Sequence, residues 1–187
     1  MSGSIDQDWI GSESNHARRA VIGLGANLGD PQAALLGAVE AFAASADVSV
    51  LACSRTYRTD PVGGPQQPKY LNAVLIIRTD LDPDALLDLA HRIEQDWGRQ
   101  RRERWGPRTL DVDLIDFDGL VLDSERLTLP HPRAHERAFV LVPWAQVDPD
   151  AVLAGAGAIR ELLADLDRTG VQDTGCGLLD DVSGAPG

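Results

Sequence analysis

Two arrangements of apolar residues take turns along residues 19–168 of the chain: a spacing of three or four positions, and short continuous runs. Two segments, beginning at Asp30-Pro31 and Asp82-Pro83, carry apolar residues every three or four positions. An acidic residue followed by proline is typical of a helix start, so both segments are predicted to be helices. Their expected buried faces are Ala34, Leu35, Ala38, Val39 and Phe42 in the first helix, and Leu86, Leu89, Ala90, Ile93 and Trp97 in the second. Short apolar runs, typical of buried strands, occur at residues 20–24, 48–57, 71–77 and 110–117.

The order of these elements, β-α-β-β-α-β, is that of the ferredoxin-like split βαβ arrangement. We therefore predict an α+β fold in which helices pack on one face of an antiparallel-rich sheet. The Asp118-Gly119 pair predicts a hairpin that joins the fourth strand to residues 120–122, and residues 159–166 are predicted to form a short helix. The expected organisation is a disordered extension, a single domain and a flexible tail, at residues 1–18, 19–168 and 169–187.

The composition, with 43% hydrophobic and 25% charged residues, is that of an ordinary soluble globular protein. A net charge of −12 disfavours binding to nucleic acid or to an anionic membrane, because both would be repelled. No apolar run approaches the roughly 20 residues that a membrane span needs, and the polar N-terminus lacks the apolar core of a secretory signal. Cys53 and Cys176 are too few and too far apart for a disulfide framework or a cysteine-based zinc site. We expect a cytoplasmic protein.

Residues 98–108 concentrate positive charge, because five of these eleven residues are arginine and only one is acidic. On an otherwise acidic chain, such a segment favours a small polyanionic ligand. Arginine also binds phosphate oxygens in a bidentate manner that lysine does not offer. A solvated charged loop is the alternative interpretation, and the segment alone does not decide between the two.

Two carboxylates follow directly, in the sequence Asp111-Val-Asp113. Residues two positions apart on a strand face the same side, so Asp111 and Asp113 are predicted to project together. Two adjacent carboxylates suit Mg²⁺, which takes one or two of them together with substrate phosphates. Beside the arginines, the pair predicts a site for a metal-bound nucleotide. The alternative is that the carboxylates form ion pairs with Arg108 or Arg104.

The glycine-rich segment 23–29 lies between a predicted strand and a predicted helix. Its last glycine comes one position too late for a dinucleotide-binding fingerprint. The chain also lacks the motif of a P-loop, which excludes a P-loop kinase. Gly25, Asn27 and Gly29 are therefore predicted to form a tight turn that makes a supporting contact at most.

Three of the nine aromatic residues lie within polar stretches of the chain: Tyr70, Trp105 and Phe139. This placement favours a planar heterocycle bound between aromatic faces. Asn72 shares a predicted strand face with Tyr70 and could read the edge of such a ring with one donor and one acceptor. Core packing is the alternative for Phe139, and a structural role is the alternative for His131.

The sequence resembles that of one enzyme family. The segment Arg104-Trp-Gly-Pro-Arg-Thr-Leu-Asp-Val-Asp113 is similar to the signature of the 6-hydroxymethyl-7,8-dihydropterin pyrophosphokinases, enzymes of folate biosynthesis. The resemblance extends from about Val21 to Pro149. Further motifs occur in the order of that family: Gly23-Leu-Gly-Ala-Asn-Leu-Gly29, Tyr57-Arg-Thr59, Gln67-Pro-Lys-Tyr-Leu-Asn72, Arg92-Ile-Glu94, and Pro130-His-Pro132 followed by Arg137-Ala-Phe139.

The resemblance implies a role for each matching residue. Asp111 and Asp113 would hold two Mg²⁺ ions bound to ATP and, with Arg99 and Arg101, would be the catalytic residues. The residues implied in ATP binding are Glu94, Arg101, Arg104, Trp105, Arg108, His131 and Arg137. The residues implied in pterin binding are Thr59, Val62, Tyr70, Asn72 and Phe139. The residues that depart from the family pattern are Asp60 and Trp144.

The implied activity is transfer of the diphosphate of ATP to the hydroxymethyl group of the pterin, with release of AMP. The implied partners are ATP and the pterin, without nucleic acid or membrane, and we expect a monomer. Two other classes stay open: a metal-dependent nucleotide hydrolase that uses the same aspartates, and a noncatalytic polyanion-binding module built on residues 99–108. Release of AMP without pterin would indicate the hydrolase, and nucleic-acid binding with a steep salt dependence would indicate the module.

Overall fold

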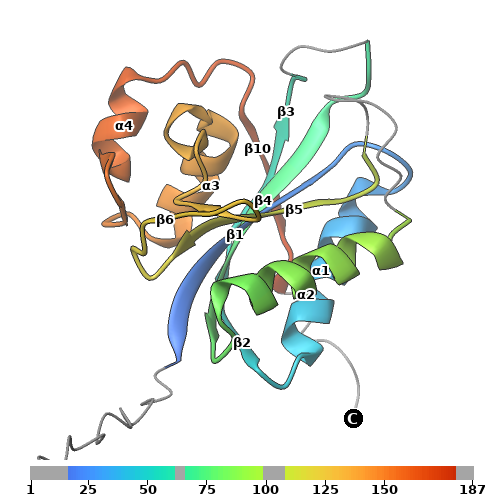
Figure 1. The fold of residues 1–187 in the computed structure, drawn as a ribbon. Coiled ribbons are helices and arrows are strands. Elements are labelled where there is room, and N and C mark those ends of the chain that lie inside the picture. Colours follow the sequence, from blue (N-terminus) through green and yellow to red (C-terminus); the bar gives the residue numbers. More distant parts are fainter. Residues whose placement is uncertain (1–16, 62–65, 99–107, 180–187) are drawn as a thin grey trace, which may run out of the picture.

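The computed structural model describes residues 17–61, 66–98 and 108–179 of the chain (Figure 1). The strands of its central antiparallel sheet are β1 (Arg18–Ala26), β2 (Val48–Cys53), β3 (Arg55–Thr59), β4 (Tyr70–Thr79), β5 (Asp111–Phe117) and β10 (Gln172–Gly177). The helices are α1 (Pro31–Ala44), α2 (Pro83–Asp96), α3 (Ala138–Val147) and α4 (Ile159–Asp165), with a 3-10 turn η1 (Ala134–Glu136). Two smaller sheets pair β6 (Leu122–Asp123) with β7 (Thr128–Leu129), and β8 (Val152–Leu153) with β9 (Gly157–Ala158).

The strands of the central sheet lie in the order β10-β3-β4-β1-β5, and β2 also pairs with β4. This topology confirms the predicted α+β class and the ferredoxin-like order of the first elements. The strand predicted at residues 48–57 is divided into β2 and β3 at Ser54. There the hydroxyl of Ser54 accepts the N–H of Val74 at 2.9 Å, so a side chain takes the place of a backbone acceptor and the strand is interrupted.

Helices cover both faces of the sheet, whereas the sequence predicted them on one face only (Figure 1). α1 and α2 pack on the face that carries Ile22 and Leu75, and α3 packs with α4 on the opposite face, which carries Val21 and Val74. Alternate residues of each strand therefore belong to different cores. The sequence did not predict α3, because this helix is apolar almost all round and contains Pro143, so it shows no amphipathic spacing.

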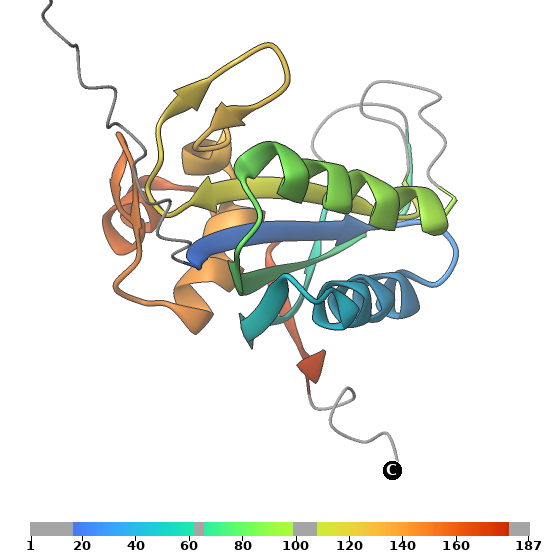
Figure 2. The same ribbon diagram turned by 60° about the horizontal axis from the view of Figure 1, so that its bottom comes forward.

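Both predicted helix starts are confirmed. The carboxylates of Asp30 and Asp82 accept the N–H three residues later at 3.1 and 2.8 Å, and proline occupies the first helical position in each case. α1 and α2 approach closely at Gly37, where a Cβ would overlap the indole ring of Trp97. Figure 2 shows these two helices against the same face of the sheet. Within the described ranges, none of the helices has the length and apolar character that a bilayer crossing requires.

The turn predicted at Asp118-Gly119 is present, but the hairpin predicted after it is wrong. The turn has φ angles of 53° and 69° at its two central residues. The chain then leaves the sheet, and β6 pairs with β7 rather than with β5. The physical reason lies at the outer edge of β5, where the carbonyl of Ile115 accepts the N–H of His131 at 2.8 Å. The segment that follows β7 therefore occupies the edge that the hairpin would need.

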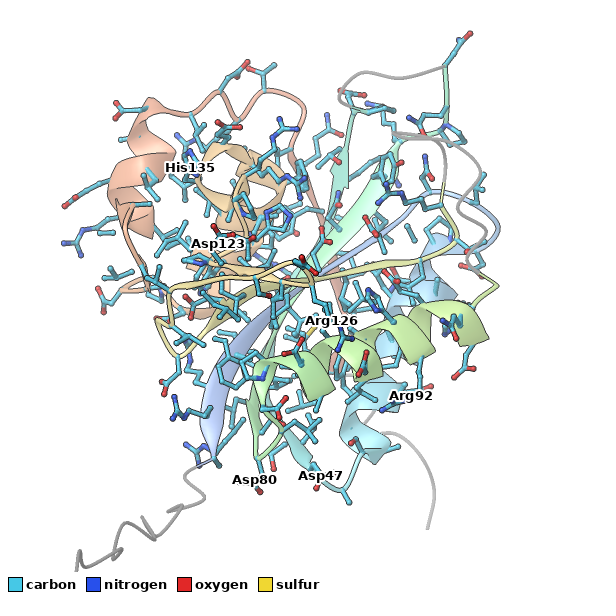
Figure 3. The ribbon with its side chains drawn as sticks, viewed as in Figure 1. Asp47, Asp80, Arg92, Asp123, Arg126 and His135 are labelled. Atoms are coloured by element: carbon cyan, nitrogen blue, oxygen red, sulfur yellow. The ribbon has the colours of Figure 1, made fainter. Side chains whose placement is uncertain are left out.

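The β6–β7 hairpin contacts α2 through Arg126 (Figure 3). Its guanidinium lies 2.6 Å from the carboxylate of Asp88 and 3.6 Å from that of Asp84, one helical turn apart. All three side chains are about half exposed, so these ion pairs orient the hairpin more than they stabilise the fold.

The folded part of the chain extends beyond both predicted domain boundaries. β1 begins at Arg18, which was predicted to lie in the N-terminal extension. Residues 172–177, predicted as part of a flexible tail, form β10 and pair with β3. Leu178, which follows, is fully buried. The glycine-rich and polar tail gives no strand pattern, because β10 pairs at the sheet edge through backbone groups. Residues 1–16 and 180–187 lie outside the described residues.

The two cysteines are predicted to differ in reactivity. Burial raises the pKa of the Cys53 thiol to about 12, whereas Cys176 is exposed. Only the thiolate reacts, so Cys53 should react roughly a thousandfold more slowly than an ordinary thiol. Titration of the native protein with a chromogenic disulfide at pH 8 should show one fast thiol, and denaturant should expose the second. The Cys176→Ser variant should lack the fast phase, and two equally fast native thiols would contradict the prediction.

Candidate active site

A cleft of about 420 Å³ opens on the sheet face that α3 covers, next to the N-terminal end of that helix. It lies where β1 ends and where its antiparallel neighbours β4 and β5 begin. The cleft brings together nine residues that the sequence placed in a site: Thr59, Tyr70, Asn72, Arg108, Asp111, Asp113, His131, Arg137 and Phe139. Because β1 separates β4 from β5, the cleft has two sides, which we call the β4 side and the β5 side.

The floor of the cleft between these sides is formed by two glycines of β1. Gly25 pairs with Asn72 on β4 and with Asp111 on β5, and Gly23 pairs with Asp113. A Cβ at Gly25 would lie 3.2 Å from Oδ1 of Asn72, and one at Gly23 would lie 3.2 Å from Cδ1 of Ile115. Gly25 was predicted to form a tight turn, but it lies within β1. The two glycines instead allow the side chains of Asn72 and Ile115 to approach β1 closely.

On the β5 side, Asp111 and Asp113 project together, as their spacing predicts, and both line the cleft. Each carboxylate has its own arginine. The guanidinium of Arg108 contacts Oδ2 of Asp111, and that of Arg137 lies 3.3 Å from Oδ2 of Asp113. The predicted pairing of an aspartate with Arg108 is therefore present, together with the predicted common orientation. Two cations and two anions thus stand side by side in an accessible cleft.

His131 supplies a neutral donor next to these charges. Its Nδ1 accepts the N–H of Arg133 at 3.1 Å, so in the neutral ring the proton is assigned to Nε2. Burial, and next the nearby charge of Arg137, lower the pKa of His131 to about 4. Its Nε2 lies 3.5 Å from the guanidinium of Arg137. Since both groups are donors, they do not satisfy one another, and an anion between them would accept from both.

The β4 side combines aromatic rings with a buried amide. Asn72 and Thr59 are only 6% and 5% exposed, and Nδ2 of Asn72 donates to Oγ1 of Thr59 at 2.8 Å. This bond leaves Oδ1 of Asn72 as the acceptor beside Gly25. Tyr70 begins β4, and burial raises the pKa of its hydroxyl. Phe139 lies in the first turn of α3, with the guanidinium carbon of Arg137 5.5 Å from its ring centroid.

This arrangement, two carboxylates with arginines on one side and rings with a buried amide on the other, agrees with the comparison to known proteins. The family model of 7,8-dihydro-6-hydroxymethylpterin-pyrophosphokinase matches residues 21–149. The chain belongs to this family. The described cleft residues from β1 to Val140 all fall within the matched part, whereas residues 167, 169, 170 and 171, which also line the cleft, lie beyond it.

Bacterial members of the family are similar over most of their length. A 2-amino-4-hydroxy-6-hydroxymethyldihydropteridine pyrophosphokinase from Methylorubrum extorquens is 47% identical over 82% of this chain and 97% of its own. One from Synechocystis is 44% identical over 85% of this chain and 82% of its own. The fold is also similar to that of a Plasmodium falciparum HPPK-DHPS crystal structure with pteroate, with a TM-score of 0.63 at 14% identity. That similarity covers 84% of this chain and 44% of the Plasmodium chain.

Asn27 connects two segments that border the cleft, residues 67–68 and Arg108. Its Nδ2 donates to Oε1 of Gln67 and to the carbonyl of Pro68, both at 3.0 Å, and its Oδ1 accepts the N–H of Arg108 at 2.8 Å. Oε1 of Gln67 also accepts the hydroxyl of Tyr70 at 3.2 Å. Asn27 was predicted to make a supporting contact at most. It instead links residues 67 and 68, which precede Tyr70, to the backbone of Arg108.

The Asn27→Ala variant should lower the free energy of unfolding by about 2 kcal/mol, because a buried residue loses three hydrogen bonds and leaves partners unsatisfied. Urea denaturation measures this loss. Asn27→Asp is the matched comparison: it keeps the acceptor for Arg108, but its second carboxylate oxygen would face the acceptor oxygens of Gln67 and Pro68, so it should be at least as destabilised as Asn27→Ala. Equal stability of all three proteins would show that these bonds contribute nothing.

Glu94, implied in ATP binding, does not line the cleft. Its side chain is buried on α2, and Oε1 accepts the N–H of Val112 at 2.8 Å, between the two cleft aspartates of β5. Its carboxylate thus reaches the backbone of β5, whose intervening residue Val112 faces the core under α1 and α2. Glu94 can position the aspartates through this contact, while its role in ATP binding stays a prediction.

The remaining predicted site residues lie outside the described part of the chain: Val62, Arg99, Arg101, Arg104 and Trp105. Their roles stay predictions.

Two parts of the cleft were not predicted from the sequence: the glycine floor and residues 167–171. The alternation of glycine along β1, at Gly23 and Gly25, was a usable signal for the floor, because both residues must share one strand face. No local pattern signals the contribution of residues 167–171, which come from a distant part of the chain.

Proposed function

We propose that this protein transfers the diphosphate of ATP to the hydroxymethyl group of 6-hydroxymethyl-7,8-dihydropterin, forming the pterin diphosphate and AMP. The observation that carries the proposal is a single cleft with a carboxylate pair on the β5 side and an aromatic and amide pocket on the β4 side. Family membership and the names of the bacterial relatives support the same substrates.

The β4 side suits a pterin. Tyr70 and Phe139 offer aromatic faces on which a fused heterocycle can stack. Oδ1 of Asn72 can accept from an amino or ring N–H group at the edge of that heterocycle, because Nδ2 is already bonded to Thr59. An amide oxygen held in this way orients the pterin, so that its hydroxymethyl group can extend over Gly25 toward β5.

The β5 side suits a nucleotide with two Mg²⁺ ions. Asp111 and Asp113 offer hard oxygen ligands on one strand face above a floor without side chains. Within residues 17–61, 66–98 and 108–179, no third His, Cys, Asp or Glu joins them in a metal-sized group, so phosphate oxygens and water would complete the coordination. Bound there, Mg²⁺ would neutralise phosphate charge and orient the phosphates for attack.

The protein's own donors complete the phosphate site. Arg108 and Arg137 can exchange their carboxylate partners for phosphate oxygens, and Nε2–H of His131 can donate to the same phosphates. The hydroxyl oxygen of the pterin bonds to the β-phosphorus as the bond from that phosphorus to AMP breaks, and the hydroxyl proton passes to solvent. With a pKa of about 4, His131 acts here as a donor rather than as a base. Positioning and charge neutralisation therefore supply the catalysis.

The test is incubation of the protein with ATP, MgCl₂ and the reduced hydroxymethylpterin, with AMP and pterin diphosphate measured together. We expect equal amounts of both products, and none in the presence of EDTA. Formation of AMP without pterin would support the nucleotide hydrolase instead. Binding of nucleic acid with a steep salt dependence, without turnover, would support the polyanion-binding module. Light scattering should give the mass of a single chain.

A further inference from the structure

A wall of the cleft is built from a part of the chain that the family match does not include. Asp167, Thr169, Gly170 and Val171 line the cleft, although the match ends at residue 149. They connect α4 to β10, and β10 pairs with β3 on the side of the sheet farthest from β5. These residues therefore border the β4 side of the cleft, away from the aspartates.

The segment is anchored at both ends and folded within itself. α4 buries Ile159 and Leu163 in the core under α3, and β10 starts with the pairing of Gln172 and Arg58. Between these anchors, Oδ1 of Asp167 accepts the N–H of Thr169 at 2.8 Å. The wall thus has a defined position with respect to the sheet.

Gly170 is the point at which this wall meets the rest of the cleft. Its φ of +88° favours glycine, and a Cβ there would lie 2.9 Å from Oδ2 of Asp60. The other oxygen of Asp60 lies 2.9 Å from Nζ of Lys69. Asp60 is thus placed between the wall and Lys69, and it directly follows Thr59, while Lys69 directly precedes Tyr70. Because Asp60 also lines the cleft, its position affects the width of the β4 side.

We propose that residues 167–171 form the outer wall of the pterin pocket and that Gly170 is a positioning residue for pterin binding. Gly170 acts through Asp60: the absence of a side chain at residue 170 lets the carboxylate of Asp60 stand between the wall and Lys69. The ion pair between Asp60 and Lys69 in turn holds their chain neighbours Thr59 and Tyr70 at the spacing that the heterocycle requires. The inference rests on the proposed function, since it assigns the wall to the pterin rather than to the nucleotide.

The Gly170→Ala variant tests the proposal, with Gly175→Ala as its matched control. Gly175 has a similar φ of +77° and belongs to the same C-terminal segment, but a Cβ there meets nothing within 4 Å. Both variants therefore carry similar backbone strain, and only Gly170→Ala forces the carboxylate of Asp60, the end of a partly exposed side chain, to shift. A misplacement of 1 Å can cost about 100-fold in rate. We expect Gly170→Ala to raise the Kd and KM for the pterin about tenfold, and to leave the KM for ATP within about twofold.

A double-mutant cycle with Asp60→Ala separates positioning from a general loss of structure. If the added methyl group acts by displacing the carboxylate, Gly170→Ala should change pterin affinity much less in the Asp60→Ala background than in the wild type. Pterin binding is measured by fluorescence titration, and both KM values by steady-state kinetics.

Two results would overturn the proposal: equal effects of Gly170→Ala and Gly175→Ala on pterin affinity, or an equal rise of the KM values for both substrates. In either case the wild-type enzyme would still form pterin diphosphate, so the proposed function would stand. A wild-type protein that binds ATP but neither binds nor converts the pterin would refute the proposed function, and this inference with it.

Discussion

Replacement of Asp113 or Asp111 by alanine is expected to abolish diphosphate transfer, with a loss of at least about a thousandfold in kcat/KM. A thousandfold loss corresponds to roughly 4 kcal/mol of transition-state stabilisation, the range expected when a metal ion and the phosphate charge it neutralises are misplaced. Both carboxylates share one face of β5 above the glycine floor, so neither can replace the other. The measurement is the rate of pterin diphosphate formation as a function of pterin concentration at saturating ATP, which gives kcat/KM, over a range of MgCl₂ concentrations.

The fold of these variants should be preserved. Removing one carboxylate relieves the repulsion between the pair but leaves Arg108 or Arg137 without its carboxylate partner. These ion pairs are partly exposed, so the two effects are small and stability should change by less than about 1 kcal/mol. Asp84→Ala, which removes an exposed carboxylate of α2, is the control and should leave activity unchanged. Near-normal transfer by either cleft variant at ordinary Mg²⁺ would refute the metal-site assignment.

The sequence predicted those elements whose signals are local. The alternation of Asp111 and Asp113 fixed their common orientation without knowledge of the fold, and Asp-Pro pairs located both helix starts. α3 and β10 were missed for opposite reasons. α3 is buried in a layer between the sheet and α4, so it has no polar face to create a period, whereas β10 is held by backbone pairing that requires no apolar pattern.

The site was predictable only as far as its residues carry their own chemistry. Carboxylates, arginines and aromatic residues within polar stretches indicate ligands by residue type. The cleft brings together six of them: Tyr70, Arg108, Asp111, Asp113, Arg137 and Phe139. Gly170 and Asn27 have no such signature, because their roles depend on neighbours that are about 110 and 40 residues away in the sequence. Glu94 has a contact that its residue type does not signal, since its buried carboxylate accepts a backbone N–H of β5, while its implied role in ATP binding stays a prediction.

Tyr70→Ala and Phe139→Ala should each weaken pterin binding much more than ATP binding. An aromatic contact contributes about 0.5–1.5 kcal/mol beyond the area that it buries, and the lost buried area adds to this. The sum predicts an increase of roughly 10- to 100-fold in the Kd for the pterin. Calorimetric titration of each ligand measures the effect. Tyr70→Phe, which keeps the ring but loses the bond to Gln67, should bind the pterin nearly as well as the wild type.

Phe139 requires a second comparison, because its ring also packs against the core under α3 and faces the guanidinium of Arg137. Phe139→Leu keeps an apolar side chain in the first turn of α3 but removes the aromatic face. If the ring stacks on the pterin, this variant should retain most of the stability of the wild type and lose most of the pterin affinity. If the ring serves only the core, Phe139→Ala should be destabilised while pterin affinity stays unchanged in all variants. A loss of stability without a loss of pterin affinity would thus assign Phe139 to the core alone.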